Sequence, residues 1–159
     1  MTKKRRIGIA IVIAVILGLG FILYRQTIPG DYVPAEDEIA LHIQLDIKED
    51  IGLLVFDYSA NGSKQSGGMS NADKSLMKHD ECLIHVWNQE TLQCSAETVE
   101  LSIQFRIITE YVDPNYDNIY PADITRYVDN PISWKARFGE SYFITITGDQ
   151  TNGYTAVLS

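Results

Sequence analysis

The chain has 159 residues and a formal net charge of −8, and 45% of its residues are hydrophobic. All 21 acidic residues, but only 8 of the 13 Lys and Arg residues, follow residue 25, which gives residues 26–159 a formal charge of −13. This acidic part of the chain excludes nucleic acid as a partner, because contacts to phosphate groups need Lys and Arg. Anionic lipid headgroups would repel it as well.

The first part of the chain predicts a membrane segment. Residues 1–6 are rich in Lys and Arg, and residues 7–24 form an uncharged apolar run that would make a helix of about 27 Å, close to the thickness of a bilayer's hydrocarbon core. Basic flanks tend to stay in the cytoplasm, so we expect residues 1–6 to be a cytoplasmic flank, residues 7–24 a transmembrane signal-anchor, and the remainder extracytoplasmic at the cell membrane. The alternative is a secreted protein whose signal is cleaved near Ala35.

Residues 25–38, with two prolines and several acids, predict a linker, and period-two patterns follow it. Apolar residues alternate with mostly polar ones over residues 39–48, which predicts a half-buried strand. Residues 51–58 predict its partner in a hairpin. Residues 59–74 are rich in Gly, Ser and Asn and predict a loop, in which Ser70 and Asp73 could cap a short helix that reaches His79.

The second half of the chain contains five further predicted strands. These are residues 81–88, 99–107, 132–138 and 141–147, and a last short strand is expected at 154–158; residues 113–131, with three prolines, interrupt the pattern. About seven strands with one polar face each predict an all-β fold over residues 39–159, as an antiparallel, immunoglobulin-like β-sandwich. A small barrel is the alternative.

The two cysteines could form a disulfide. Cys82 and Cys94 both lie in the part expected outside the membrane, where disulfides persist. They would face each other if the intervening stretch formed a hairpin, and otherwise they are small buried side chains.

A calcium site is conceivable after the longest predicted strand. Oxygen-bearing side chains at alternate positions can converge on one ion, and Asp113, Asn115 and Asp117 have this spacing, with Asp123 further along. The glycine and the glutamate of an EF-hand loop are missing, so any such site would be a looser one. The competing interpretation is a turn in which Asp and Asn side chains bond to their own backbone.

Several aromatic residues cluster around the same segment. Exposed tyrosines can stack on sugars or contact a protein partner, since each has an apolar ring and a polar tip. The candidates for partner binding are Tyr116, Tyr120, Tyr127 and Trp134. Packing over one end of the core is the alternative role.

No established catalytic motif occurs in the sequence. The spacings of His42, His79 and His85 relative to the cysteines fit no standard zinc pair, and we expect His42 and His85, which fall in strands, to face solvent or a polar partner. No cofactor is therefore expected apart from calcium at the candidate site above.

These observations predict a single-pass membrane protein that displays an acidic β-sandwich as a binding or structural module. Its expected partners are the membrane, through the N-terminal helix, and a protein or a glycan. The alternative from a different class is a small carbohydrate-active or hydrolytic domain with a pair of carboxylates in a cleft.

Overall fold

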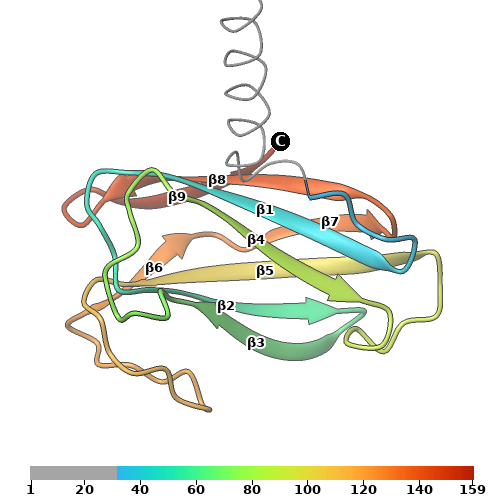
Figure 1. Cartoon of the computed structure of the whole chain (residues 1–159), viewed down its shortest axis with the longest axis horizontal. Coiled ribbons are helices and arrows are strands. Elements are labelled where there is room, and N and C mark those ends of the chain that lie inside the picture. Colours follow the sequence, from blue (N-terminus) through green and yellow to red (C-terminus); the bar gives the residue numbers. More distant parts are fainter. Residues whose placement is uncertain (1–31) are drawn as a thin grey trace, which may run out of the picture. The chain divides into compact units, whose positions relative to one another are not determined.

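The computed structural model describes residues 32–159, which form nine β-strands (Figure 1). The strands are β1 (Glu38–Ile47), β2 (Leu53–Ala60), β3 (Ser63–Met69), β4 (Cys82–Asn88), β5 (Thr98–Ile108), β6 (Thr125–Asp129), β7 (Ile132–Arg137), β8 (Ser141–Asp149) and β9 (Gly153–Leu158). The prediction of an all-β fold is confirmed for this part of the chain. The predicted basic flank, the membrane segment at 7–24 and the first part of the linker lie outside the described residues, and no helix within 32–159 could cross a membrane.

The strands form one curled sheet in the order β3-β2-β5-β6-β9-β8-β1-β4, and β7 pairs with β5 beyond the end of β6. Two neighbouring pairs, β1 with β8 and β6 with β9, are parallel, and the others are antiparallel. The expectation of about seven purely antiparallel strands is therefore wrong in number and in direction. The two additional strands are β3 and β6, in segments predicted to be irregular.

Both halves of the sheet face a single hydrophobic core. Alternate residues of the two longest strands point into it with almost no exposed surface, as the period-two pattern predicts. On β1 these residues are Ile39, Leu41, Ile43, Leu45 and Ile47, and on β5 they are Val99, Leu101, Ile103, Phe105 and Ile107. The residues between them point outward, and on β5 they are mostly polar.

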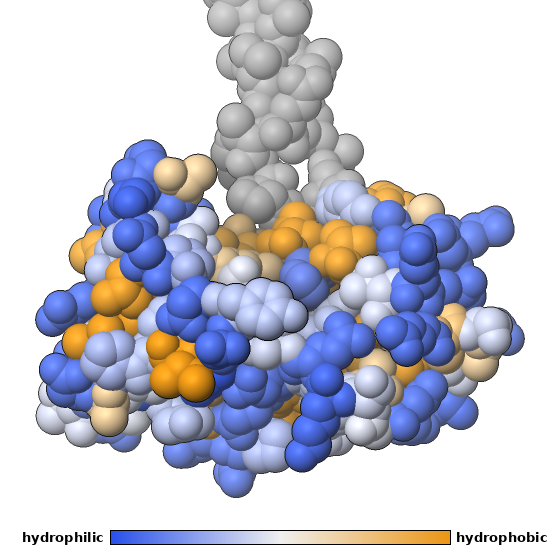
Figure 2. Space-filling model, turned by 90° about the horizontal axis from the view of Figure 1, so that it is seen from below, coloured by the Kyte–Doolittle hydropathy of each residue, from blue (hydrophilic) through white to orange (hydrophobic). Residues whose placement is uncertain are grey.

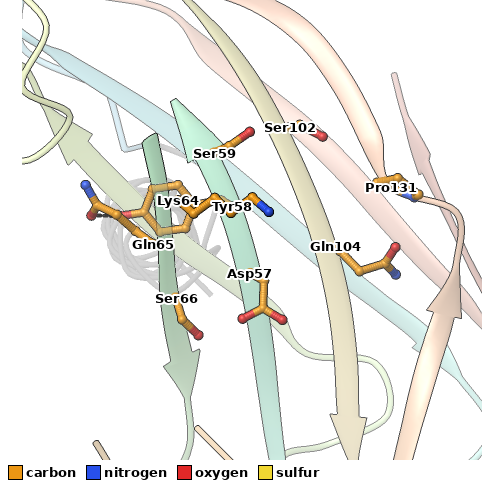
Figure 3. Close-up of a pocket in the computed structure, with 9 residues that line it drawn as sticks. All are labelled: Asp57, Tyr58, Ser59, Lys64, Gln65, Ser66, Ser102, Gln104 and Pro131. Atoms are coloured by element: carbon orange, nitrogen blue, oxygen red, sulfur yellow. Dashed lines mark hydrogen bonds between the residues drawn. The ribbon is translucent and has the colours of Figure 1, made fainter. Parts of the chain in front are cut away.

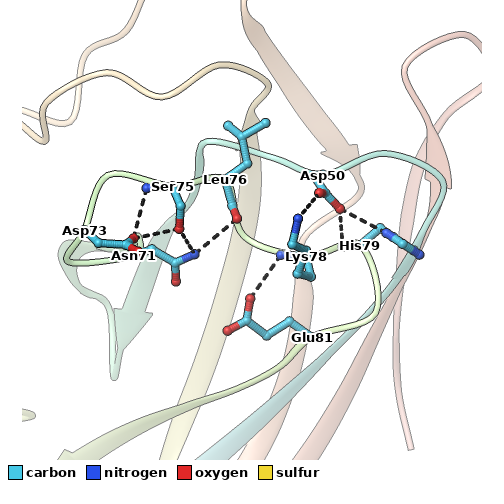
Figure 4. A network of polar contacts seen from close by, with 8 residues as sticks. All are labelled: Asp50, Asn71, Asp73, Ser75, Leu76, Lys78, His79 and Glu81. Carbon is cyan, nitrogen blue, oxygen red and sulfur yellow. Dashed lines mark hydrogen bonds and ion pairs between the residues drawn. The ribbon is translucent and has the colours of Figure 1, made fainter.

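β1 and β2 do not form the predicted hairpin. β1 pairs with β4 and β8, whereas β2 pairs with β3 and β5, so the short connection between them passes from one half of the sheet to the other. Asp50 fixes this connection to the loop before β4: its carboxylate accepts hydrogen bonds from Lys78 Nζ (2.7 Å) and from the backbone N and Nδ1 of His79 (3.0 and 2.9 Å; Figure 4). The hydrogen bond from Lys78, followed by those from His79, holds the pKa of Asp50 well below its usual range.

The predicted loop at 59–74 contains a hairpin instead. Asn61 and Gly62 have φ angles of 49° and 88°, and this pair of positive values makes the tight two-residue turn that joins β2 to β3. β3 lacks an apolar pattern because it is an edge strand with little buried surface. Gly67 within it leaves room for the ring of Phe56, since a Cβ there would lie 2.7 Å from Phe56 Cε2.

The predicted short helix after Ser70 is absent from this described segment. Asp73 Oδ1 instead accepts hydrogen bonds from the backbone N (3.0 Å) and Oγ (2.6 Å) of Ser75, which makes a local turn (Figure 4).

The two strand histidines pack against aromatic rings and form no hydrogen bond within residues 32–159, which differs from the expectation that they face solvent or a polar partner. His85 on β4 lies between aromatic rings of the core, 4.8 Å from the centroid of Phe56 and 4.6 Å from that of Trp87. His42 on β1 is only 3% exposed and stacks on Phe143 at 4.6 Å. Burial lowers the pKa of both imidazoles, that of His85 to about 4.

We predict that the free energy of unfolding decreases as the pH is lowered from about 6.5 to about 4. In this window the unfolded chain binds a proton at His85 that the folded chain excludes, so acid favours unfolding, by about 3 kcal/mol for a shift of this size. Urea titrations at a series of pH values measure the effect.

The matched variant is His85→Phe, which keeps an aromatic ring at this place and removes the titrating group. Its stability should depend on pH much less steeply between pH 6.5 and 4 than that of the wild type. An equally steep dependence in both proteins would contradict a neutral His85 packed between aromatic rings.

Candidate functional site

An open groove lies on the outer face of β3, β2 and β5 (Figure 3). It has a volume of about 740 Å³ and is open to solvent. Its lining residues are Asp57, Tyr58, Ser59, Lys64, Gln65, Ser66, Ser102, Gln104 and Pro131. The alternation that turns Phe56 and Tyr58 toward the core turns Asp57 and Ser59 outward into this groove.

Short polar side chains make the floor of the groove. Ser59 on β2 lies opposite Lys64 on β3 and Ser102 on β5, and Ser102 lies opposite Ser133 on β7. Neighbouring strands are about 4.8 Å apart, so the three serines form a regular row across the sheet. The face is hollow because serines occupy these central positions.

A second row holds a carboxylate and an amide. Asp57 lies opposite Ser66 on one side and Gln104 on the other. Gln104 lies near the passage from β6 to β7, and its Nε2 donates a hydrogen bond to the Val128 carbonyl (2.5 Å). Its Oε1 has no hydrogen-bond partner within residues 32–159 and is available to a ligand.

The groove also contains other groups without a partner. Neither Lys64 Nζ nor Ser59 Oγ has a hydrogen bond or an ion pair with any other described residue, whereas Ser133 Oγ donates to Ser102 Oγ at 2.9 Å. Lys48, Lys74, Lys78, Arg106 and Arg137, by contrast, all form ion pairs. The groove therefore combines hydroxyl groups with one unpaired ammonium group.

Arg106 contacts Asp57, one of the residues that line the groove. Its guanidinium pairs with Asp57 Oδ2 at 3.0 Å and donates to the backbone carbonyl of Asn118 at 3.0 Å. Asn118 Nδ2 in turn donates to Ser66 Oγ at 3.0 Å, so the loop at 109–124 is attached to both β5 and β3. Asp57 is half exposed and is largely neutralised by Arg106.

The structure divides the four predicted partner residues into two pairs. Tyr116 is fully exposed on the loop. Tyr127 on β6 is 67% exposed and lies opposite Arg106 on β5, on the same face of the sheet as the groove. Tyr120 is partly buried and packs on a small apolar cluster beneath the loop, and Trp134 packs against the main core. Two of the four thus have a structural role.

The predicted calcium ligands are not brought together. Asp113 pairs with Lys74 (2.8 Å), whose hydrogen bond lowers the pKa of that carboxyl. Asn115 Oδ1 accepts a hydrogen bond from the backbone N of Ile119 (3.1 Å), which is the turn considered as the alternative. Asp117 and Asp123 are exposed, and no three acidic, histidine or cysteine side chains gather around a possible ion anywhere in residues 32–159.

The predicted disulfide is not formed, because the two cysteines lie at opposite ends of β4. Cys82 begins the strand, whereas the backbone N of Cys94 donates to the Gln89 carbonyl (3.0 Å) just beyond its end. Six strand steps separate Cys82 from Asn88, a span of about 20 Å, and a disulfide needs Cα atoms within about 7 Å. Both thiols are free.

The predicted carboxylate pair has no counterpart in the groove. Asp57 is the sole carboxylate among the nine lining residues. Sequence reasoning missed the groove itself, although the serines at outward positions of three strands were a usable signal. Their alignment depends on a strand register that the sequence does not reveal.

Two comparisons with known proteins give no match. No model of a known protein family matches the chain, and no curated protein matches it. The site must therefore be interpreted from its own geometry.

We predict that Tyr120→Ala destabilises the domain whereas Tyr116→Ala does not. Removing the half-buried ring of Tyr120 exposes the apolar cluster beneath it and should lower the free energy of unfolding by about 1–2 kcal/mol. Tyr116 contributes no buried surface, so its substitution should change stability by less than about 0.5 kcal/mol. Chemical denaturation measures both, and equal losses would contradict the assignment of separate roles.

Proposed function

We propose that this chain is a single-pass membrane protein that presents its acidic β-domain outside the membrane as a binding module. The apolar run at 7–24 with its basic flank supports the anchor, and the charge of −13 after residue 25 supports a soluble, displayed body.

The groove on β3, β2 and β5 is the observation that carries the binding role. It holds Lys64, Ser59 and the Oε1 of Gln104 without partners, although most other basic residues of the described part are paired. Hydrogen-bonding groups left free in a hollow are available to a ligand. The exposed Tyr116 and Tyr127 extend this surface over the neighbouring loop and β6.

We infer in addition that the curled sheet is a β-sandwich related in architecture to immunoglobulin domains. Its two halves enclose one core, and Trp87 on β4 is buried there, as expected for such a domain. The parallel pairing of β1 with β8 and of β6 with β9 makes it a variant of that architecture.

Catalysis is not part of the proposal. Acid–base cleavage of a glycosidic bond needs two carboxylates a defined distance apart, and the lining of the groove supplies only Asp57.

The proposal predicts that the C-terminal domain is accessible from outside an intact cell. Full-length protein with a C-terminal tag should lose the tag when intact cells are treated with protease, while a cytoplasmic protein in the same cells stays whole. The tagged chain should also sediment with the membranes. A tag that is protected in intact cells and lost only after lysis would overturn the proposed display.

The basic flank provides a matched control for orientation. Replacing Lys3, Lys4, Arg5 and Arg6 by uncharged residues removes the charge bias that keeps this end in the cytoplasm. We expect a measurable fraction of the variant to insert in the opposite direction and to keep a protease-protected tag. An unchanged orientation would contradict the role given to these four residues.

A further inference from the structure

We infer that the groove on β3, β2 and β5 binds a neutral, hydroxyl-rich glycan chain that lies across the strands. This inference rests on the proposed binding function and specifies its ligand. The argument proceeds from the charge of the groove, its hydrogen-bonding groups and its shape.

The charge of the groove disfavours an ionic ligand. Asp57 and Arg106 neutralise each other at 3.0 Å, so Lys64 is the remaining charge among the lining residues. A strongly anionic ligand would meet one ammonium group within a body of charge −13, and a cationic ligand would meet a carboxylate that is already paired. One ammonium group is too little complementary charge for a strongly anionic ligand, and a paired carboxylate is too little for a cationic one.

The surface around the groove also disfavours an apolar ligand. Figure 2 shows the domain from below the view of Figure 1, the side on which β2 and β3 are drawn. This face is largely hydrophilic, and polar side chains interrupt its hydrophobic areas. Seven of the nine lining residues carry a hydroxyl, amide, carboxylate or ammonium group on an aliphatic stem, and the other two are Tyr58 and Pro131, so a ligand meets polar groups set among carbon-bound surface. A neutral polar ligand remains.

The free groups of the groove suit sugar hydroxyls, which donate and accept hydrogen bonds at once. Lys64 Nζ is a donor, Gln104 Oε1 is an acceptor, and the hydroxyl of Ser59 can act as either. The exposed oxygens of Asp57, although paired with Arg106, add a further acceptor. These groups lie on three adjacent strands at intervals of about 4.8 Å, so they can contact successive units of a chain.

Tyr127 supplies an apolar contact beside this polar floor. Its ring is 67% exposed and lies opposite Arg106 in the register of β6 and β5. A tyrosine ring can pack against the carbon-bound face of a sugar while its hydroxyl stays in water. The volume of about 740 Å³ is in the range of small-molecule sites, and the open shape admits a chain that continues beyond it.

An extended peptide fits this place less well. A peptide that binds a β-sheet gains most from pairing its backbone with a free edge, and in the described residues β3 offers such an edge, because it pairs with β2 alone. The groove lies on the face of the sheet, where the backbone groups are already paired with neighbouring strands.

Affinity electrophoresis of the full-length chain tests the inference. The protein should be kept in a detergent without a sugar headgroup, such as an amine oxide, and run through gels that contain a β-linked glucan, an α-linked glucan, a mannan or the acidic polygalacturonate. We expect retardation by at least one neutral polysaccharide, with little change between low and high salt. Retardation by polygalacturonate alone, which disappears with salt, would overturn the inference.

Two matched variants locate the binding. Ser102→Tyr fills the floor of the groove and should abolish retardation, whereas Thr155→Tyr, on an exposed position of β9, should leave it unchanged. Tyrosine is favoured in strands, so both variants should fold, and their melting temperatures verify this. Equal retardation of the wild type and a folded Ser102→Tyr variant would overturn the inference.

A third variant separates hydrogen bonding from charge. Lys64→Gln retains a donor, so the affinity for a neutral glycan should fall by no more than about tenfold, the loss of one interaction. Complete loss of binding in this variant would show that charge carries the interaction and would contradict a neutral ligand. Failure of all three neutral polysaccharides overturns the ligand class, while protease accessibility of the domain on cells independently tests the proposed display.

Discussion

Burial of alternate residues of β1, β2 and β5 in one core is the constraint on which the rest of the domain depends. Because side chains of a strand point alternately to its two faces, fixing the inward row also fixes the outward row. On β5 the inward row consists of large apolar residues with almost no exposed surface. The residues between them, including Ser102 and Gln104, must then face outward. A shift of one residue in the register would exchange these rows and would place polar groups in the core.

Polar contacts at the ends of strands fix the connection between β1 and β2 in place. Asp50 attaches the connection between β1 and β2 to the loop before β4. Just before it, Glu49 Oε1 accepts hydrogen bonds from the buried Tyr154 hydroxyl on β9 and from the backbone N of Gln150, both at 2.5 Å. Asp149 pairs with Lys48 and accepts hydrogen bonds from the turn that joins β8 to β9, and these contacts, Lys48 first, hold its pKa well below the usual range. The short segment at 48–50 is therefore attached to two distant parts of the chain, residues 78–79 and residues 149–154.

The sequence predicts the local elements of this fold much better than their partners. Central strands such as β1 and β5 could be found because burial imposes period two on their residues. β3 and β6 could not, since edge and short strands bury little and keep no pattern, although the Asn61-Gly62 pair was a turn signal for β3. The pairing of β1 with β8 joins residues about a hundred positions apart, which no local pattern encodes. The groove could not be predicted for the same reason, because its serines become neighbours only through strand pairing. Nor could the burial of Tyr120 and Trp134, which depends on the fold of the surrounding chain.

The position of the groove on paired strands has a consequence for how it can bind. Its polar groups project from backbone that is hydrogen-bonded on both sides at β2 and β5, and the inner faces of these strands are packed in the core. A ligand would therefore meet groups that are already in place, and binding would cost little ordering of the protein backbone. Lys64 is the exception, because its long exposed side chain must lose rotamer freedom when it binds. Rigid short side chains on the floor, rather than this lysine, would then determine which ligand fits, and the field of the acidic body would reinforce the choice by repelling anionic chains of the same shape.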